Sequence, residues 1–508
     1  MGPSKSLEVT CHGSAPDVDA EVGLAHLPVE ILRLIIGFFP LTLTTKNWVD
    51  YENLMLSRQT LCDLSLTCRV LRTLSQEHLC SCVRADSSKR LALFLRSILE
   101  RPELSELVRQ LYVGHFTSEN NSCIVGLQTL DLGNTDLKQL STTQLSLLAR
   151  CPVPDPRRTF QHLVGFLLLT TARLERLVMS FKRTWTRSTR SEGIEALISG
   201  VLADGSHELS LPSLQQLEMK SEFNQYHNFV RIPACPFFVP SLLSVAKLKT
   251  LRIPCDDGKW RLFDGIRPSQ LFALENICLN GSSTNGSNLS RLLRRCPSLK
   301  SLTIAMEFDI SHVETYVLSG HHVRISDTLP DYCPKLHTLD LQFKGLGGFF
   351  LKAEPHLTRL ADLKDLMNLR VDLPVLFHGT DDLRNADLEQ RLPPNLATLE
   401  LYDMWSGDQR FRVHYTYRGD SAIYIKTHER VDASVDPLTL MLLRLASVSS
   451  RSLPKLRSVR VKSLVYDHDL GQTSRQLIAA FAEVGIDFQI MSFHEMEHCP
   501  LSFAGVED

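Results

Sequence analysis

One short pattern, Leu-x-x-Leu-x-Leu with aliphatic substitutions, recurs along most of the chain and constrains its fold more than any other feature of the sequence. Clear copies begin at Leu127, Leu174, Leu214, Leu248, Leu274, Leu299, Leu336, Leu366, Leu396 and Leu456, and weaker ones begin at Val108 and Gly485. Alternate side chains of a strand point to the same face, so each copy predicts a short strand whose last two aliphatic side chains enter a common core. The clear copies start 25 to 60 residues apart, so the repeat is irregular.

Amphipathic stretches lie between the copies and predict helices, the clearest at 289–296, 438–448 and 474–484. One strand and one helix per repeat predict an α/β solenoid over residues 108–493, with short parallel strands backed by helices. This region resembles the leucine-rich repeats, although most of its spacings exceed the roughly 20 to 29 residues of that family. An unrelated helical array is the alternative.

The N-terminal part of the chain carries two apolar stripes at helical spacing. The first contains Leu27, Ile31, Leu34 and Ile35, with Pro28 in the first helical turn; the second contains Leu61, Leu64, Cys68, Leu71 and Leu74. Residues 24–80 resemble the F-box, whose pattern is Leu-Pro-x-Glu-Ile-Leu, a spacer, then Leu-x-Leu-x-x-Cys-Arg and an apolar position. The matching residues are Leu27, Pro28, Glu30, Ile31 and Leu32, then Leu64, Leu66, Cys68, Arg69 and Leu71.

The spacer from Gly37 to Gln59 departs from this resemblance because it is longer than in most F-boxes and contains Trp48 and Tyr51. It leaves open the loop geometry, and with it whether the spacer alters adaptor binding. A helical hairpin that caps the solenoid is the alternative for residues 24–80. A tail over 1–23, a helical linker over 81–107 and a second tail over 494–508 complete the expected organisation.

The F-box resemblance implies that this helical module docks on a Skp-type adaptor, and through it on a cullin/RING ubiquitin ligase. The residues it implies for adaptor binding are Leu27, Pro28, Ile31, Leu32, Ile35, Leu64, Leu66, Cys68 and Leu71. A substrate-recognition subunit of such a ligase needs neither catalytic residues nor a cofactor, because its contribution is proximity. A non-catalytic leucine-rich-repeat scaffold outside ubiquitination is the alternative function.

Residues between and beside the strand leucines are expected to line the concave surface of the solenoid and contact a protein substrate. The strongest candidates are Glu218, Arg252, Asp340, Arg370, Glu400, Tyr402 and Arg460, and equivalent positions include Asp131, Arg176, Lys220, Asn276, Thr303, Gln342, Asp372 and Lys462. An insertion at 405–436 predicts a β-hairpin with a turn at Gly419 and Asp420. Its aromatic residues Trp405, Tyr415 and Tyr417 are further candidates, since such residues are enriched at binding hot spots.

The 55 basic and 57 acidic residues give a net charge of -2, which argues against nucleic acid or an anionic membrane as a bulk partner. The first twenty residues are polar, and no apolar run approaches the roughly 20 residues of a membrane span. Thirteen cysteines without a C-x-x-C pair favour reduced thiols in the cytoplasm or nucleus. Cys-Pro recurs at Cys151, Cys235, Cys296 and Cys333, which favours a repeat feature over a ligand set.

His494, Glu495 and His498 spell H-E-x-x-H, a pattern in which two imidazoles one helical turn apart hold zinc and the Glu acts as a base. Pro500 lies two positions after His498, and only ten residues remain after His498 for a third ligand. A zinc hydrolase is therefore a distant alternative, and no bound metal is expected.

Overall fold

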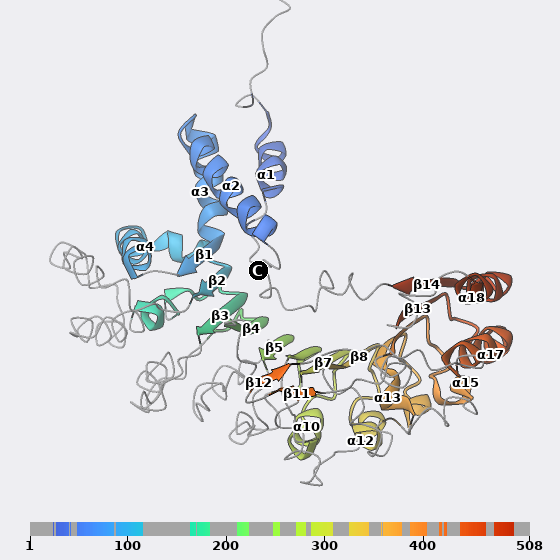
Figure 1. The fold of residues 1–508 in the computed structure, drawn as a ribbon. Helices are drawn as coiled ribbons and strands as arrows, with labels where there is room; N and C mark the ends of the chain where they lie inside the picture. Colours follow the sequence, from blue (N-terminus) through green and yellow to red (C-terminus); the bar gives the residue numbers. More distant parts are fainter. Residues whose placement is uncertain are drawn as a thin grey trace, which may run out of the picture. The chain divides into compact units, whose positions relative to one another are not determined.

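The computed structural model describes two compact units, Met1–Ser81 and Cys82–Asp508, which we call the helical unit and the sheet unit (Figure 1). The described residues are 24, 27–39, 41, 48–85, 88–114, 163–168, 170–182, 211–222, 247–254, 271–280, 286–307, 325–344, 357, 359–377, 387–403, 416–418, 421–423, 437–463 and 472–491. The two expected tails and the copy at Leu127 lie outside them. Among the helices of these ranges, none is both long enough and apolar enough to cross a bilayer.

The helical unit contains α1 (Val29–Gly37), α2 (Trp48–Ser65) and α3 (Arg69–Ser81), and both α1 and α2 pack on α3. Leu32 and Ile36 of α1 are buried, as are Leu61 of α2 and Leu71 and Leu74 of α3. The second apolar stripe of the sequence is therefore divided between two helices instead of continuing along one. Part of the long spacer also differs from a loop, because α2 already begins at Trp48.

The break between α2 and α3 has a local cause at residues 65–68. The hydroxyl groups of Ser65 and Thr67 donate to the Cys62 and Leu64 carbonyls at 2.6 and 2.8 Å, which satisfies two carbonyl groups near the end of α2. The Cys68 sulfur accepts a hydrogen bond from the Leu71 backbone N–H at 3.5 Å, as an N-cap side chain does. The turn leaves Leu66 highly exposed between two buried helix faces.

Twelve parallel strands form the sheet of the sheet unit, and their order in the sheet is their order in the sequence. They are β1 (Cys82–Ala85), β2 (Gln110–Val113), β3 (Arg176–Lys182), β4 (Gln216–Glu222), β5 (Thr250–Pro254), β6 (Asn276–Asn280), β7 (Ser301–Glu307), β8 (Thr338–Lys344), β9 (Asn368–Asp372), β10 (Thr398–Asp403), β13 (Ser458–Ser463) and β14 (Asp487–Met491). Every Leu-x-x-Leu-x-Leu copy in the described ranges supplies one strand, which confirms the α/β fold with parallel strands. Strand β1 was not expected, because residues 81–107 were predicted to be helical throughout.

Strand register explains why the aliphatic spacing is constant. The second aliphatic position of each copy forms one row across the sheet: Leu111, Leu177, Leu217, Leu251, Ile277, Leu302, Leu339, Leu369, Leu399, Val459 and Phe488. All these side chains are buried, and the positions two residues later, such as Leu341 and Val461, form a second buried row. Because burying one such side chain stabilises the fold by about 1.5–3 kcal/mol, the two rows hold the sheet unit together.

A repeated backbone contact joins each strand to the next at the turn that precedes it. The Arg109 carbonyl accepts hydrogen bonds from the backbone N–H groups of Glu175 and Arg176 at 2.8 and 2.9 Å. The Lys300 carbonyl accepts in the same way from His337 and Thr338, at 2.8 and 3.0 Å. Strand register therefore does not depend on the length of the connection between two strands.

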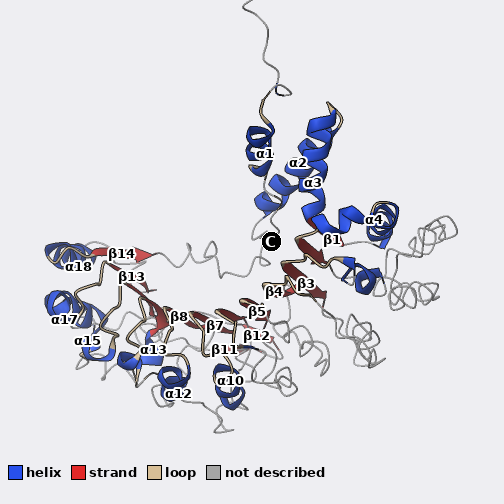
Figure 2. Cartoon of the chain, turned by 180° about the vertical axis from the view of Figure 1, so that it is seen from behind, coloured by secondary structure: helices blue, strands red, loops and turns tan. Residues whose placement is uncertain are grey.

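A layer of helices backs the C-terminal half of the sheet (Figures 1 and 2). Its members are α10 (Gly286–Leu293), α12 (Ile325–Tyr332), the 3-10 helix η9 (Leu360–Asp362), α15 (Leu388–Arg391), α17 (Pro437–Ser452) and α18 (Gln472–Glu483), each in contact with the next. The helices predicted at 289–296, 438–448 and 474–484 correspond to α10, α17 and α18. Helices pack about 8–10 Å apart and strands about 4.8 Å apart, so this stretch bends with its sheet on the inner side.

Shorter elements complete the described parts of the sheet unit. Near its start, α4 (Ser88–Glu100) contacts β1 and the 3-10 helix η2 (Pro102–Leu107), and α13 (Leu373–Leu376) contacts β9 and β10. Strands β11 (Thr416–Arg418) and β12 (Ser421–Ile423) pair antiparallel within the insertion for which a hairpin was predicted. Tyr417 lies in β11, whereas Trp405 and Tyr415 lie outside the described residues.

Two of the five cysteines that precede a proline occupy equivalent turns in neighbouring repeats. Cys296 and Cys333 are both buried, and their carbonyls accept from the N–H groups of Leu299 and Leu336, each at 3.1 Å. Burial raises the pKa of the Cys333 thiol to about 12, and burial together with Cys333 raises the pKa of Cys296 further. Both therefore act as small apolar core residues. Cys151 and Cys235 lie outside the described residues.

Candidate functional site

A row of mostly polar side chains crosses the sheet on the face opposite the aliphatic rows, and we call it the central row. Strand register aligns Arg84, Tyr112, Val178, Glu218, Arg252, Cys278, Thr303, Asp340, Arg370, Glu400, Arg460 and Gln489. Six of the seven strongest substrate candidates belong to it, and the seventh, Tyr402, lies two positions beyond Glu400 on the same strand face. The structure thus brings together residues that are up to 242 positions apart, from Glu218 to Arg460.

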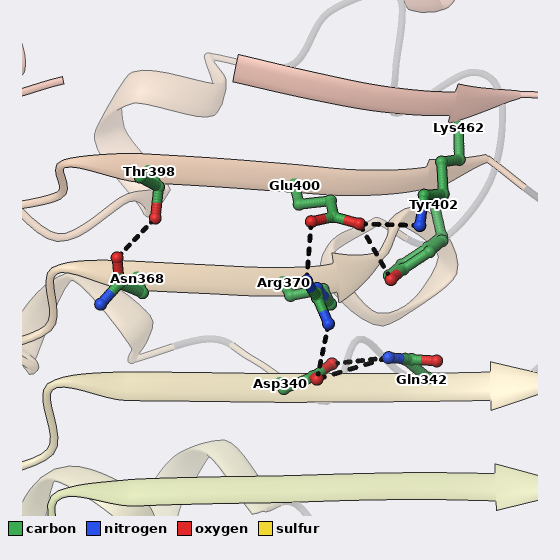
Figure 3. A network of polar contacts seen from close by, with 8 residues as sticks. All are labelled: Asp340, Gln342, Asn368, Arg370, Thr398, Glu400, Tyr402 and Lys462. Carbon is green, nitrogen blue, oxygen red and sulfur yellow. Dashed lines mark hydrogen bonds and ion pairs between the residues drawn. The ribbon is translucent and has the colours of Figure 1, made fainter. Parts of the chain in front are cut away.

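Arg370 links two carboxylates across three neighbouring strands (Figure 3). Its Nη1 lies 3.3 Å from Asp340 Oδ2 on β8, and its Nη2 lies 3.0 Å from Glu400 Oε2 on β10. Adjacent strands are about 4.8 Å apart, so one forked guanidinium reaches a carboxylate on each side. The three side chains form one charged ladder across the sheet.

A second cation completes the environment of Glu400. Lys462 Nζ lies 3.0 Å from Glu400 Oε1, and the Tyr402 hydroxyl donates to the same oxygen at 3.0 Å. The Lys462 ammonium group also lies 5.0 Å from the centre of the Tyr402 ring, within the range of a cation–π contact. Lys462 is only 2% exposed, so its charge depends on these partners and not on water.

The two carboxyl groups of the ladder respond to burial in opposite ways. Burial alone would raise the pKa of Glu400, but Arg370 and Lys462, with hydrogen bonds from Lys462 and Tyr402, lower that pKa below its usual value. At Asp340 burial dominates and raises the pKa to about 6, although Arg370 and a hydrogen bond from Gln342 oppose it. The Gln342 amide donates to Asp340 Oδ1 at 3.0 Å. The surroundings therefore stabilise the charged form of Glu400, whereas burial destabilises the charged form of Asp340.

Replacing Asp340 with Asn is expected to stabilise the protein above pH 6. A carboxyl group whose pKa is raised by folding binds protons in the folded state between about pH 4 and 6, so stability falls as the pH rises through this window. Asn keeps the uncharged form and an oxygen for Arg370. We expect the variant to gain on the order of 2 kcal/mol over wild type at pH 8 and much less at pH 4.5. Urea denaturation at both pH values measures the difference, and an equal effect at both would contradict the explanation.

A second, smaller ion-pair cluster lies in the N-terminal half of the central row. Arg176 Nη2 on β3 lies 2.8 Å from Glu218 Oε2 on β4, and Arg252 Nη1 on β5 lies 4.0 Å from Glu218 Oε1. The Arg176 and Glu218 side chains are 12% and 9% exposed, whereas Arg252 is 46% exposed. Glu218 is thus neutralised by the closer arginine.

The depth of these side chains corrects the expectation that all of them line an open concave surface. Glu218, Asp340, Glu400 and Tyr402 are buried, as are Gln342, Asp372 and Lys462 at neighbouring positions. Arg370 is partly exposed, and Arg252 and Arg460 are exposed. Spacing within a strand predicts which face a residue occupies but not how deeply neighbouring strands bury it.

In the helical unit, α1 has apolar side chains on two faces. One face is buried through Leu32 and Ile36 against α3, whereas Ile31, Leu34 and Phe38 are 42%, 63% and 84% exposed. The exposed residues are three and four positions apart and so lie on one side of the helix. Helices that are apolar on both sides are usually covered on both sides.

The sequence-predicted adaptor residues divide between these faces and the α2–α3 turn. Leu32 and Leu71 are buried in the core, Leu27, Ile35, Leu64 and Cys68 are half-buried, and Pro28, Ile31 and Leu66 are exposed. Leu34 and Phe38 were not among the predicted site residues, although the spacing of Leu27, Ile31, Leu34 and Phe38 could have indicated them. Of the thirteen large apolar side chains exposed in the described ranges, nine belong to this unit.

Within the ranges that the structure describes, no three His, Cys, Asp or Glu side chains are grouped so that they could hold a metal ion. The H-E-x-x-H segment lies outside these ranges. What the described residues offer instead is an exposed apolar helix face in one unit and a charged sheet face in the other. No model of a known protein family matches this chain, and a comparison with curated proteins gives no match.

Proposed function

We propose that this protein is a substrate-recognition subunit of a Skp-cullin-F-box type ubiquitin ligase. The helical unit docks on the Skp-type adaptor, and the sheet unit, as a divergent leucine-rich-repeat solenoid, binds a protein substrate. The chain itself carries out no chemistry, because it holds the substrate where a conjugating enzyme reaches it. This activity belongs to the cytoplasm or the nucleus.

The observation that carries the proposal is the exposed apolar face of α1. Ile31 belongs to the F-box-like motif, and Leu34 and Phe38 extend the same side of the helix. Covering one large apolar side chain contributes about 1.5–3 kcal/mol, so a partner that covers all three gains several kcal/mol from this face alone. A helix laid in a groove of the partner is the interface that suits such a stripe.

The sheet unit supports the second half of the proposal through its organisation. Parallel strands in sequence order present one continuous polar face, on which residues from distant parts of the sequence converge. Such a face contacts a partner along many strands at once, which suits recognition of another protein.

Co-expression of the full chain with a Skp-type adaptor and a cullin tests the proposal. We expect a stable ternary complex that elutes as one peak in size-exclusion chromatography. If a folded chain captured neither protein, the ligase function would be wrong, and a scaffold outside ubiquitination would be the better account.

A further inference from the structure

In the central row the acidic residues are buried, whereas two of the arginines are exposed. Its acidic residues, Glu218, Asp340 and Glu400, have side chains that are only 9%, 7% and 10% exposed, and each forms an ion pair with an arginine of the same sheet face. Arg252 and Arg460 are exposed. A row that is mixed in sequence therefore presents positive charge to an approaching molecule.

The two exposed arginines, Arg252 on β5 and Arg460 on β13, have equivalent surroundings. Arg252 lies beside Glu218, which Arg176 already holds at 2.8 Å, so the Arg252–Glu218 distance is 4.0 Å. Arg460 is in register with Glu400, whose two oxygens are taken by Arg370 and Lys462 at 3.0 Å each. In both places the neighbouring carboxylate is satisfied by a closer cation, and the guanidinium keeps donors for a ligand.

The distance between the arginines follows from strand order. Six strand-to-strand steps separate β5 from β13, which at about 4.8 Å each gives about 29 Å along the sheet. An extended peptide advances about 3.3 Å per residue, so roughly nine residues span this distance. Cys278 and Thr303, which follow Arg252 in the row, carry small side chains.

We infer that the central row binds an extended acidic segment of a protein, with one carboxylate cluster on Arg252 and another on Arg460. The inference rests on the proposed function, since it names the kind of segment that the substrate offers. Two arginines about 29 Å apart suit a polypeptide better than a nucleic acid, whose closely spaced phosphates favour many adjacent cations. The exposed carboxylate on this face of β14, Asp487, lies at the sheet edge and accepts from Gln489 at 2.8 Å.

Fluorescence anisotropy with the full chain and synthetic peptides tests this inference. The probe is a fluorescein-labelled peptide with two Glu residues at each end of a nine-residue Gly-Ser spacer, and the comparison peptides carry Gln in place of Glu or a two-residue spacer. At about 50 mM salt, where screening is weak, we expect the long Glu peptide to bind at least about tenfold more tightly than either comparison peptide. Equal binding of the Gln peptide would overturn the inference, and equal binding of the short-spacer peptide would overturn the two-anchor form of it.

Charge reversal identifies the anchors. Arg252→Glu and Arg460→Glu are each expected to weaken binding about three- to tenfold, and the double variant at least about tenfold. Arg457→Glu with Arg475→Glu is the matched control, because both arginines are exposed in the sheet unit but lie off the polar face. An equal loss in the control would show bulk charge attraction and overturn the inference.

A labelled twelve-nucleotide single-stranded DNA decides between ligand classes. If it bound more tightly than the long Glu peptide and depended on the same arginines, the ligand class would be wrong. Loss of peptide binding would not affect capture of the adaptor, which depends on the helical unit. Loss of adaptor capture would not affect peptide binding, which depends on the sheet unit. The two proposals can therefore be tested separately.

Discussion

Replacing Leu34 and Phe38 together with Asp is expected to abolish capture of the Skp-type adaptor while the chain remains folded. Both side chains are largely exposed, so charge at these positions costs the isolated protein little. In the complex the same carboxylates would be buried in an apolar groove without partners. Hot-spot residues contribute about 2 kcal/mol or more each, so we expect the affinity to fall at least about 100-fold. Isothermal titration calorimetry with the purified adaptor measures the change.

The matched control for this variant is Leu93→Asp with Ile478→Asp. These residues are 46% and 49% exposed on helices of the sheet unit, so the control adds the same charges to apolar surface elsewhere. It should bind the adaptor like wild type. Equal loss in both double variants, or no loss in the Leu34 and Phe38 variant, would exclude α1 as the docking face. Leu32→Asp is unsuitable, because Leu32 is buried and its replacement disrupts the helical unit itself.

Replacing Glu400 with Ala is expected to destabilise the C-terminal half of the sheet unit by about 3–5 kcal/mol, because two cations lose their shared carboxylate. Lys462 is almost wholly buried and depends on Glu400, whereas Arg370 keeps Asp340. Hydrogen exchange at the backbone amides of β9, β10 and β13 measures the loss locally, since repeat units depend on their nearest neighbours. Glu483→Ala, at an exposed position of α18, should leave the exchange rates unchanged.

A double replacement separates the charge effect from loss of packing. Glu400→Leu with Lys462→Met removes a buried carboxylate and a buried ammonium group together, so neither is left unpaired. It should cost less than Glu400→Ala alone. A larger cost would mean that the side-chain volumes, and not the compensation of charge, stabilise this part of the sheet.

The strands were predictable from sequence because a period of two on one face and a fixed preceding leucine leave few other ways to bury the pattern. Strand β1 was not predicted because Cys80, and not an aliphatic residue, stands three positions before Val83. The face of each candidate site residue followed from the same alternation. Its depth did not, because the burial of Glu400 depends on Arg370, Tyr402 and Lys462, which come from three different strand positions.

In the helical unit, too, residue spacing predicts the faces of a helix, whereas packing determines which face is buried. Both apolar faces of α1 are visible in the sequence, but only packing against α3 decides that Leu32 is core and Ile31 is surface. The α2–α3 break at Leu66 was hidden because apolar residues continue on both sides of it at helical spacing.

The backbone hydrogen bonds that connect the turn before one strand to the turn before the next have an evolutionary consequence. Since Arg109, Lys300 and their equivalents fix the strands from turn to turn, a connection between strands can gain or lose residues without shifting the frame. The segment between β10 and β13, which carries the β11–β12 hairpin, is an insertion of this kind. Loops grafted into such connections can diversify what a protein of this architecture recognises, while selection on the sheet continues independently.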